Sequence, residues 1–270
     1  MIGTLRRWIP RCALTTSTAF AKPSGCGSVR TVFERVRTQE LLTRFLPLPP
    51  ATVLDIGGGT GVHAQWLAER GYSVHLIDPI EEHVAVAARL SNVCSAVGDA
   101  RYLSQADDSQ DAVLMLGPLY HLPEREDRLQ ALREALRVAR PGAPVIAAGI
   151  SRHATLMDIG SDGRLTEAVE PFLRQLHTTG QFRGNVVGFT TAYLHFPDEP
   201  AQDLVDAGLR DAQVYGVEGP AGPTLRALGM DCLDERLDAA VRAARIVERD
   251  PMLIAASGHL LAVGRVQDSD

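Results

Sequence analysis

The sequence of 270 residues has little lysine, few cysteines and no long apolar run, and each shortage excludes a class of protein. Lys22 is the only lysine and the net charge is −6, so a broad positive surface for nucleic acid or an anionic membrane is not expected. The four cysteines form no C-x-x-C pair, which indicates neither a zinc site nor a disulfide framework and suits a reducing compartment. No apolar run approaches the length of a membrane span. We therefore expect a cytoplasmic globular protein, monomeric or homodimeric, with no membrane or nucleic-acid partner.

The first 28 residues differ in composition from the rest. They contain four basic residues, many Ser and Thr, and no acidic residue, which is similar to a transit peptide. A disordered extension, or a start codon assigned too far upstream, is the alternative that we favour. Pro10 and Arg11 interrupt the only apolar stretch that could belong to a secretory signal. We expect residues 1–28 to lie outside the fold and residues 29–270 to form the folded domain.

Strands and helices alternate after the Pro-rich segment LPLPP at 46–50. Apolar runs predict five strands, at 51–56, 73–77, 93–97, 111–116 and 144–150, and helical patterns lie between them at 61–70, 81–90 and 124–140. Alternation of this kind predicts βαβ units and a parallel sheet that helices cover on both faces. The expected fold class is therefore α/β, a doubly wound and mostly parallel sheet.

The second part of the chain is less regular. It predicts helices at 158–177, 198–207 and 234–248, and strands at 189–196, 212–217 and 259–266. The segment 179–185 is typical of a loop. We interpret residues 152–200 as a cap over the substrate.

The glycine-rich segment VLDIGGGTG, at 53–61, joins the first strand to a helix, which is typical of nucleotide-type cofactor sites. Gly57, Gly59 and Gly61 have the spacing G-x-G-x-G, whereas a dinucleotide site has G-x-G-x-x-G and Val62 stands at the position of its last glycine. Asp55 would also repel a pyrophosphate. A cofactor with a cationic amino group fits better, and S-adenosylmethionine has one beside its carboxylate.

Two further carboxylates follow the next two strands. Asp78 ends "VHLID", where it can accept hydrogen bonds from both ribose hydroxyls, although sites for nicotinamide cofactors use the same device. Asp99 ends "AVGD", where it can accept the adenine amino group. A glycine loop and two acids at three consecutive strand ends are far more specific for S-adenosylmethionine than the glycines alone.

These motifs resemble those of the class I S-adenosylmethionine-dependent methyltransferases over residues 31–270. "VLDIGGGTG", "LIDP" and "VGDARYL" are similar to the glycine, ribose and adenine motifs, and "DAVLMLGPLYHL" to the fourth-strand motif of a group that acts on small molecules. The resemblance implies a seven-stranded sheet, S-adenosylmethionine as cofactor and a small-molecule methyl acceptor. The implied cofactor-binding residues are Arg37, Asp55, Gly57, Gly59, Gly61, His63, Asp78, Pro79, Asp99, Ala100, Leu116 and Gly117. Relatives carry a Tyr-rich lid segment where this chain has "AKPSGCGSVR".

Tyr120 and His121 follow the fourth strand and are the candidate catalytic residues. A histidine there can accept a proton at neutral pH, and the alternative is that His121 fixes the loop or lines the cofactor pocket. The alternative for Tyr120 is a packing residue or one that lines the substrate pocket. His153 is a weaker acid–base candidate.

Three other polar residues have open roles. His63 opens the helix after the glycine loop, where it can touch the cofactor or the acceptor, or face solvent. His195 is expected to be structural. Glu218 ends a late strand and can face the substrate.

Two other functions stay open beside methyl transfer to a nitrogen, oxygen or carbon of a small metabolite. The first is an NAD(P)-dependent oxidoreductase on a similar sheet, against which Asp55, Asp99 and the glycine spacing argue. The second is a regulator that binds S-adenosylmethionine without catalysis. The Asn/Asp-Pro-Pro-aromatic motif of nucleic-acid amino-methyltransferases is replaced by "LGPLYH", which argues against DNA or RNA as substrate.

Overall fold

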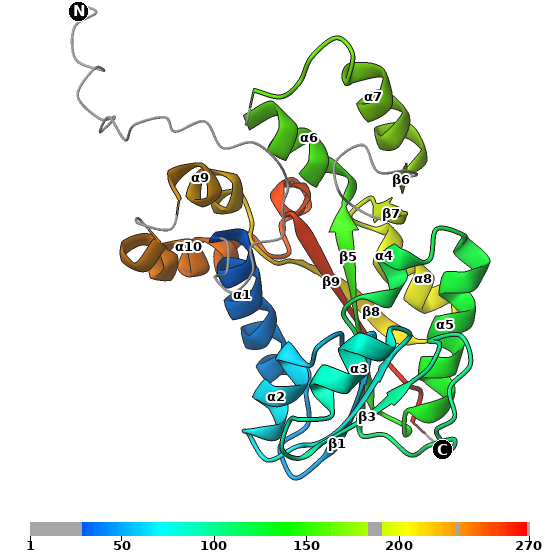
Figure 1. Ribbon diagram of the computed structural model, residues 1–270. Helices are drawn as coiled ribbons and strands as arrows, with labels where there is room; N and C mark the ends of the chain where they lie inside the picture. Colours follow the sequence, from blue (N-terminus) through cyan, green and yellow to red (C-terminus); the bar gives the residue numbers. More distant parts are fainter. Residues whose placement is uncertain (1–28, 162, 183–190, 230–232, 269–270) are drawn as a thin grey trace, which may run out of the picture.

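A nine-stranded sheet forms the centre of the protein (Figure 1). The computed structural model describes residues 29–161, 163–182, 191–229 and 233–268, so the expected N-terminal extension lies outside the described residues. Five parallel strands stand in the order β3-β2-β1-β4-β5. They are β1 (Thr52–Ile56), β2 (Ser73–Asp78), β3 (Val93–Val97), β4 (Ala112–Met115) and β5 (Pro144–Ser151).

The last strand of the chain is inserted next to β5. It is β9 (His259–Arg265), which pairs antiparallel with β5 on one side and with β8 (Arg210–Gly216) on the other. These seven strands make the doubly wound, mostly parallel sheet that the sequence predicts. A hairpin of β6 (Gln181–Phe182) and β7 (Ala192–His195) adds two short strands. β7 pairs with Ile150 and Ser151 at the end of β5.

Helices cover both faces of the sheet, as the continuous apolar strands require. In β4, the side chains of Ala112 and Leu114 pack in a core with the helices α1 (Val29–Phe45), α2 (Val62–Ala68) and α3 (Glu81–Ala87). Those of Val113 and Met115 pack in a core with α5 (Arg125–Val138) and α8 (Glu199–Asp206) on the other face. A strand with two buried faces cannot show a polar–apolar alternation, which explains its uninterrupted hydrophobic sequence. The helices are α1 (Val29–Phe45), α2 (Val62–Ala68), α3 (Glu81–Ala87), α4 (Pro118–His121), α5 (Arg125–Val138), α6 (Arg152–Ser161), α7 (Glu170–Thr179), α8 (Glu199–Asp206), α9 (Ala221–Leu228) and α10 (Leu233–Val247). None of the helices in these described segments has both the length and the apolar character needed to cross a membrane.

The cap segment and two helices differ from the expectation. The single helix predicted at 158–177 is two helices, α6 and α7, and Gly163 between them has a positive φ of 67° that does not continue a helix. The one-turn helix α4 and the helix α9 have no counterpart among the predicted elements. α6 and α7 lie beyond the carboxyl end of β5, at the top of Figure 1.

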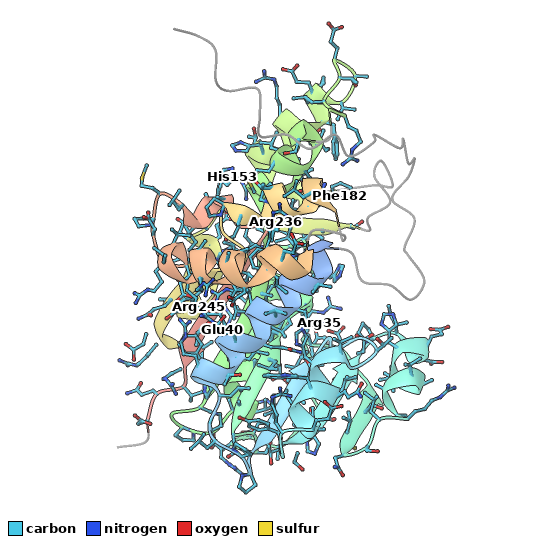
Figure 2. All side chains as sticks on the ribbon, turned by 90° about the vertical axis from the view of Figure 1, so that its left-hand side faces the viewer. Arg35, Glu40, His153, Phe182, Arg236 and Arg245 are labelled. Carbon is cyan, nitrogen blue, oxygen red and sulfur yellow. The ribbon has the colours of Figure 1, made fainter. Side chains whose placement is uncertain are left out.

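A buried arginine attaches α1 to the C-terminal half of the chain. The Arg37 side chain is fully buried, and its guanidinium donates to the carbonyl oxygen of Val217 at 3.1 Å and to Glu248 at 2.7 Å. A third bond of 2.6 Å joins it to Glu40 on the same helix. Glu40 also pairs at 2.6 Å with Arg245 of α10, and Figure 2 shows these two side chains where α1 and α10 lie side by side. α1 is therefore fixed across the edge of the site described below.

Candidate functional site

Two adjoining cavities lie at the carboxyl ends of the parallel strands, where ligands bind in doubly wound folds. The larger, of about 540 Å³, lies over the ends of β1, β2 and β3. The smaller, of about 210 Å³, lies between the glycine loop, α1 and β9. Gly57, Gly117 and Tyr120 line both cavities, so these three residues form the wall that the two share.

The glycine loop has a backbone shape that only glycine adopts without strain. Gly57 has φ of 69° and Gly59 has φ of 58°. A Cβ atom on Gly57 would come within 2.8 Å of the Pro118 ring, whereas one on Gly59 would meet no atom within 4 Å because that residue faces the larger cavity. The loop therefore packs against α4 on one side and presents bare backbone to a ligand on the other.

Asp78 ends β2 and is 5% exposed. Its Oδ2 accepts a hydrogen bond of 2.9 Å from the amide of Gly59, and its Oδ1 accepts one of 3.0 Å from the amide of Ile80. His83 Nδ1 lies 3.1 Å from the same Oδ1. A carboxylate has about four acceptor positions and three are engaged, so Asp78 keeps about one for a ligand in the larger cavity, which it lines beside Pro79, and gains a second where His83 turns away.

Asp99 lies at the far end of the larger cavity, next to Ala100. Arg101 binds both of its carboxylate oxygens, with Nε 3.0 Å from Oδ1 and an Nη 2.6 Å from Oδ2, and this pairing lowers the pKa of Asp99. Arg101 lines the same cavity and was not singled out from the sequence. An adenine amino group could therefore bind the Asp99 carboxylate only beside Arg101, or after displacing Arg101 from it.

Asp55 is the most unusual group of the site. The residue is 1% exposed and lines the smaller cavity. Its Oδ2 has no hydrogen-bond partner among the described residues. Burial, with a smaller contribution from the charge of Asp78, raises the pKa of Asp55 from 3.8 to about 7. A buried carboxylate oxygen without a partner is costly, and a cation placed against it would remove that cost. The residues present therefore fit a cofactor with an ammonium group.

His63 lies in the smaller cavity within reach of the charge of Arg35, an exposed residue of α1 that lines neither cavity. His63 lines the cavity, and its Nδ1 has no partner in the described part of the chain. Burial, followed by the positive charge of Arg35 on α1, lowers the pKa of His63 to about 4, so the ring is neutral at physiological pH. Figure 2 shows Arg35 on α1.

Arg37, which the resemblance implies as a cofactor ligand, lines neither cavity. Its donors are engaged with Val217, Glu40 and Glu248, because the helix turns this residue toward α10 and the end of β8. The structure therefore assigns Arg37 to the packing of α1, and we leave it out of the cofactor site. Arg35, two residues earlier, is the arginine whose charge reaches the site.

Tyr120 and His121 both lie on α4 but differ in what they face. The Tyr120 hydroxyl donates to the carbonyl oxygen of Leu116 at 3.1 Å, and burial raises the pKa of Tyr120 to about 12, so it stays a neutral phenol at physiological pH. His121 lines the larger cavity with Asp78 and Thr191 and does not line the smaller one. Desolvation lowers the pKa of His121, while the backbone of Thr191 and the charge of Asp78 oppose this shift. This position favours the alternative given for His121, a residue of the cofactor pocket.

Of a three-residue cluster beside the smaller cavity, the sequence analysis named Glu218 but missed Glu34 and His259. His259, the first residue of β9, lines that cavity together with Glu34 of α1. Glu218 accepts hydrogen bonds from the backbone amide of His259 at 2.9 Å and pairs with its Nδ1 at 2.5 Å. Glu34 Oε2 lies 3.6 Å from His259 Nε2. The signal was present, because an antiparallel strand begins at the edge where its parallel neighbours end.

The two other histidine candidates lie in the cap region. His195 is completely buried, neither ring nitrogen has a partner among the described residues, and burial lowers its pKa to about 3, which fits the expected structural role. The ring of His153, labelled in Figure 2, contacts the ring of His177 in a tilted arrangement, with centroids 5.3 Å apart. His153 lines neither of the two cavities described above.

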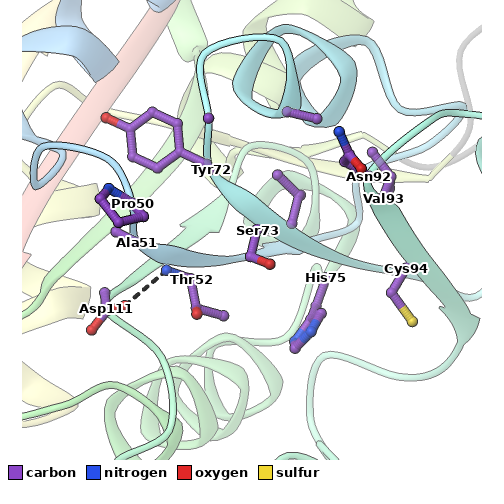
Figure 3. Close-up of a pocket in the computed structure, with 13 residues that line it drawn as sticks. Pro50, Ala51, Thr52, Tyr72, Ser73, His75, Asn92, Val93, Cys94 and Asp111 are labelled. Carbon is purple, nitrogen blue, oxygen red and sulfur yellow. Dashed lines mark hydrogen bonds between the residues drawn. The ribbon is translucent and has the colours of Figure 1, made fainter.

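A further cavity, of about 690 Å³, lies at the opposite edge of the sheet. Figure 3 shows its lining at the amino ends of β1, β2 and β3, including Thr52, Ser73 and Val93. The amide of Thr52 donates to Asp111 there at 2.7 Å. The glycine loop and both strand-end aspartates lie at the other edge, so this cavity has none of the features of the cofactor site.

Comparison with known proteins is consistent with this geometry. Residues 53–142, from β1 to the end of α5 and the turn after it, match a protein family described as "Methyltransferase domain". Methyltransferase GfsG of Streptomyces halstedii is 30% identical over 147 residues, 52% of this chain and 51% of that protein. The ubiquinone/menaquinone biosynthesis C-methyltransferase UbiE of Acidiphilium cryptum is 32% identical over 126 residues, 44% of this chain and 49% of that protein. The chain thus spans about half the length of the curated relatives it matches.

These matches support a class I methyltransferase. Solved structures agree at the level of the fold. A methyltransferase from Methanosarcina mazei has a TM-score of 0.55 at 20% identity, covering 84% of this chain and 98% of that one. Phosphoethanolamine N-methyltransferase 2 of Haemonchus contortus, solved in complex with S-adenosyl-L-methionine, has a TM-score of 0.54 at 20% identity, covering 92% of this chain and 62% of that one. Together with the family match, these neighbours support S-adenosylmethionine as the cofactor.

Proposed function

We propose that the protein transfers a methyl group from S-adenosylmethionine to a small organic molecule. The observation that carries the proposal is the buried Asp55, whose unpartnered oxygen lies beside a glycine loop at the junction of two cavities. The methylated sulfonium supplies an activated methyl group when the cofactor is bound. What the chain contributes is binding, orientation and a site sheltered from water.

Each end of the cofactor has a matching part of the site. The larger cavity suits the adenosine, with Asp78 accepting from the ribose hydroxyls and Asp99, Ala100 and Arg101 around the base. The smaller cavity suits the amino-acid end, with Asp55 facing the ammonium and His63 beside it. Gly57, Gly117 and Tyr120 separate the two cavities, and Leu116 lines the smaller one. In place of Arg37, whose donors bind Val217, Glu40 and Glu248, we propose that the exposed Arg35 reaches the carboxylate, since it lies on the same helix and its charge acts on His63.

The acceptor is proposed to be small because the smaller cavity offers about 210 Å³ and must also receive the end of the cofactor. α6 and α7, within the expected cap, lie beyond the end of β5 and can bound a larger acceptor (Figure 1). Relatives that match the chain include enzymes whose names place them in quinone biosynthesis, which is consistent with a metabolite as acceptor. Nitrogen, oxygen and carbon acceptors all remain compatible with the site, and so does a role in specialised metabolism.

Calorimetric titration of the full-length protein tests the cofactor. S-adenosylmethionine and its demethylated product S-adenosylhomocysteine are expected to bind, and NADH is not, because Asp55 would face a pyrophosphate in that cofactor. Binding of NADH without binding of either adenosyl compound would refute the proposal. With binding established, incubation with radiolabelled S-adenosylmethionine and a panel of phenols, amines and carboxylic acids tests methyl transfer.

A further inference from the structure

Glu34 and His259 line the smaller cavity together with the glycine loop, and Glu218 contacts His259 from outside the lining of that cavity, forming the Glu34–His259–Glu218 cluster. Glu34 comes from α1, Glu218 follows β8, and His259 begins β9. Glu218 is 4% exposed, and its two oxygens are directed to the amide and to Nδ1 of His259. Two carboxylates, one from α1 and one from the segment after β8, therefore lie beside the imidazole of His259.

The hydrogen bonds determine which nitrogen of His259 can act. A carboxylate accepts a hydrogen bond, so the Glu218 contact places the proton of a neutral imidazole on Nδ1. Glu34 lies 3.6 Å from Nε2, beyond hydrogen-bond distance, so Nε2 is the basic nitrogen of that neutral ring. His259 lines the smaller cavity, and its Nε2 lies 3.6 Å from Glu34. This is the arrangement of a base that is held by a third group, as in triads that activate a nucleophile.

Glu34 and His259 share the cavity with the groups proposed to hold the amino-acid end of the cofactor, next to its sulfonium. Asp55, Gly57 and Tyr120 line the same 210 Å³ as Glu34 and His259. Glu34 and Tyr120 line the same cavity, and after burial the charge of Glu34 is the further cause of the raised pKa of Tyr120. An acceptor between the two sides would have the methyl group on one side and the imidazole on the other.

We propose that His259 is the catalytic base of the methyl transfer and that Glu34 binds the acceptor group beside it. The proposal rests on the proposed function and takes the acceptor as an amine or a hydroxyl compound, since His259 and Glu34 are groups that hydrogen-bond to the N–H or O–H whose proton is lost. The acceptor's lone pair forms the bond to the methyl carbon while the carbon–sulfur bond breaks and its electron pair stays on sulfur. The acceptor's proton passes to Nε2, and the imidazolium is stabilised by Glu218 and Glu34 until the proton leaves to water. Glu218 is a positioning residue.

Sinefungin tests the placement without knowledge of the acceptor, because it carries a carbon with an amino group where S-adenosylmethionine has the methylated sulfur. S-adenosylhomocysteine has neither that amino group nor the methyl. The ratio of the two dissociation constants therefore reports on the groups that face the reacting position. A hydrogen bond that involves a charged group corresponds to at least about tenfold in affinity. We expect wild-type protein to prefer sinefungin, and His259→Ala and Glu34→Gln each to reduce that preference about tenfold with S-adenosylhomocysteine binding kept.

His75→Ala, at the opposite edge of the sheet, and Glu126→Gln, on an exposed side chain, are the matched controls and should keep the preference. Glu34 is 36% exposed, so Glu34→Gln tests the proposal even where His259→Ala fails to fold. Failure of the wild-type protein to bind S-adenosylhomocysteine would refute the proposed function. Binding with a preference that neither variant changes would refute only the role of the cluster.

Two further measurements separate a base from other roles. Long-range proton–nitrogen correlation on histidine-labelled protein should show His259 protonated at Nδ1, and Glu218→Gln should shift the ring toward the other tautomer. A structural role of Glu218 alone would not link that shift to a loss of sinefungin preference. Titration with Mg²⁺, Mn²⁺ and Zn²⁺ tests the same three side chains as metal ligands. A sinefungin preference that appears only with one of these ions would overturn the assignment of His259 as a base.

Discussion

The amide of Gly59 donates a hydrogen bond of 2.9 Å to Oδ2 of Asp78, which connects the glycine loop to the end of β2. The residue proposed to bind the ribose therefore also fixes the loop proposed to bind the rest of the cofactor. Asp78→Asn should weaken S-adenosylhomocysteine binding at least about tenfold, because charge-assisted hydrogen bonds to the ligand and to the loop are both weakened. Calorimetry measures the affinity, with Asp107→Asn on an exposed side chain as control. An unchanged dissociation constant in a folded variant would contradict the assignment.

Cofactor binding should depend on pH through Asp55. Its pKa is about 7 in the free protein, and a bound ammonium favours the ionised form. As the pH falls below about 7, binding must release a proton from Asp55, so the affinity should fall toward tenfold per pH unit. Titrations between pH 5.5 and 7.5 in buffers of different ionisation enthalpy would detect both effects. Asp55→Asn should bind weakly and without this pH dependence, and a wild-type affinity that is constant over the range would contradict the prediction.

The same residue should make the protein less stable as the pH rises. The pKa of Asp55 is above its unfolded value of 3.8, so between pH 3.8 and about 7 the native state binds the proton more tightly than the unfolded state. The free energy of unfolding therefore loses a contribution over that interval. Asp55→Asn should melt higher than wild type at pH 8, by at least about 2 °C, and the gain should shrink toward pH 4. Thermal denaturation at both pH values measures it; a gain that grows toward low pH would reverse the sign.

Two neighbouring arginines on α1 should separate stability from binding. Arg37→Ala removes the buried guanidinium from Glu248, which keeps Arg44, and takes the donor from the Val217 carbonyl, so it should lower the free energy of unfolding by about 2–4 kcal/mol. Arg245→Ala, which removes a half-exposed pair with Glu40, should cost about 1 kcal/mol or less. Arg35→Ala should leave the melting temperature near wild type and weaken cofactor binding. Loss of binding in a folded Arg37 variant with Arg35→Ala unaffected would restore the role first expected for Arg37.

Substitution of His121 and substitution of His259 should affect ligand binding differently. His121 lines the cavity proposed for adenosine, so His121→Ala should weaken sinefungin and S-adenosylhomocysteine alike and leave their ratio unchanged. His259→Ala should change the ratio. In a transfer assay, His121→Ala should then lose turnover together with cofactor affinity. A loss of turnover of about 10²–10⁴ with unchanged cofactor affinity would instead make His121 the base.

Much of the cofactor side could be predicted from the sequence because its residues stand next to strand ends. Asp55, Asp78 and Asp99 lie within or just after β1, β2 and β3, and a parallel sheet brings such ends to one edge. The direction of Arg37 could not be predicted in this way. The same helix carries Arg35 as well. Only the packing of α1 against α10 decides that Arg37 is buried there and Arg35 is exposed.

The other side of the site could not be derived from local pattern. The contact between Glu34 and His259 depends on β9 pairing between β5 and β8, which no sequence periodicity encodes. Arg101 was missed for another reason, since an arginine two residues after Asp99 is ordinary in a loop until its guanidinium is seen on both carboxylate oxygens.

The insertion of β9 between β5 and β8 also has a consequence for synthesis of the chain. Except for Thr191, the residues that line the larger cavity are made before the cap, whereas His259 is made after the cap and β8. Contacts between distant parts of a chain form late, because the intervening segment must first be ordered. A growing or truncated chain that ends before β9 would therefore carry the residues for holding the cofactor but not the imidazole that faces it. In such a chain the methyl donor would be sheltered on one side only.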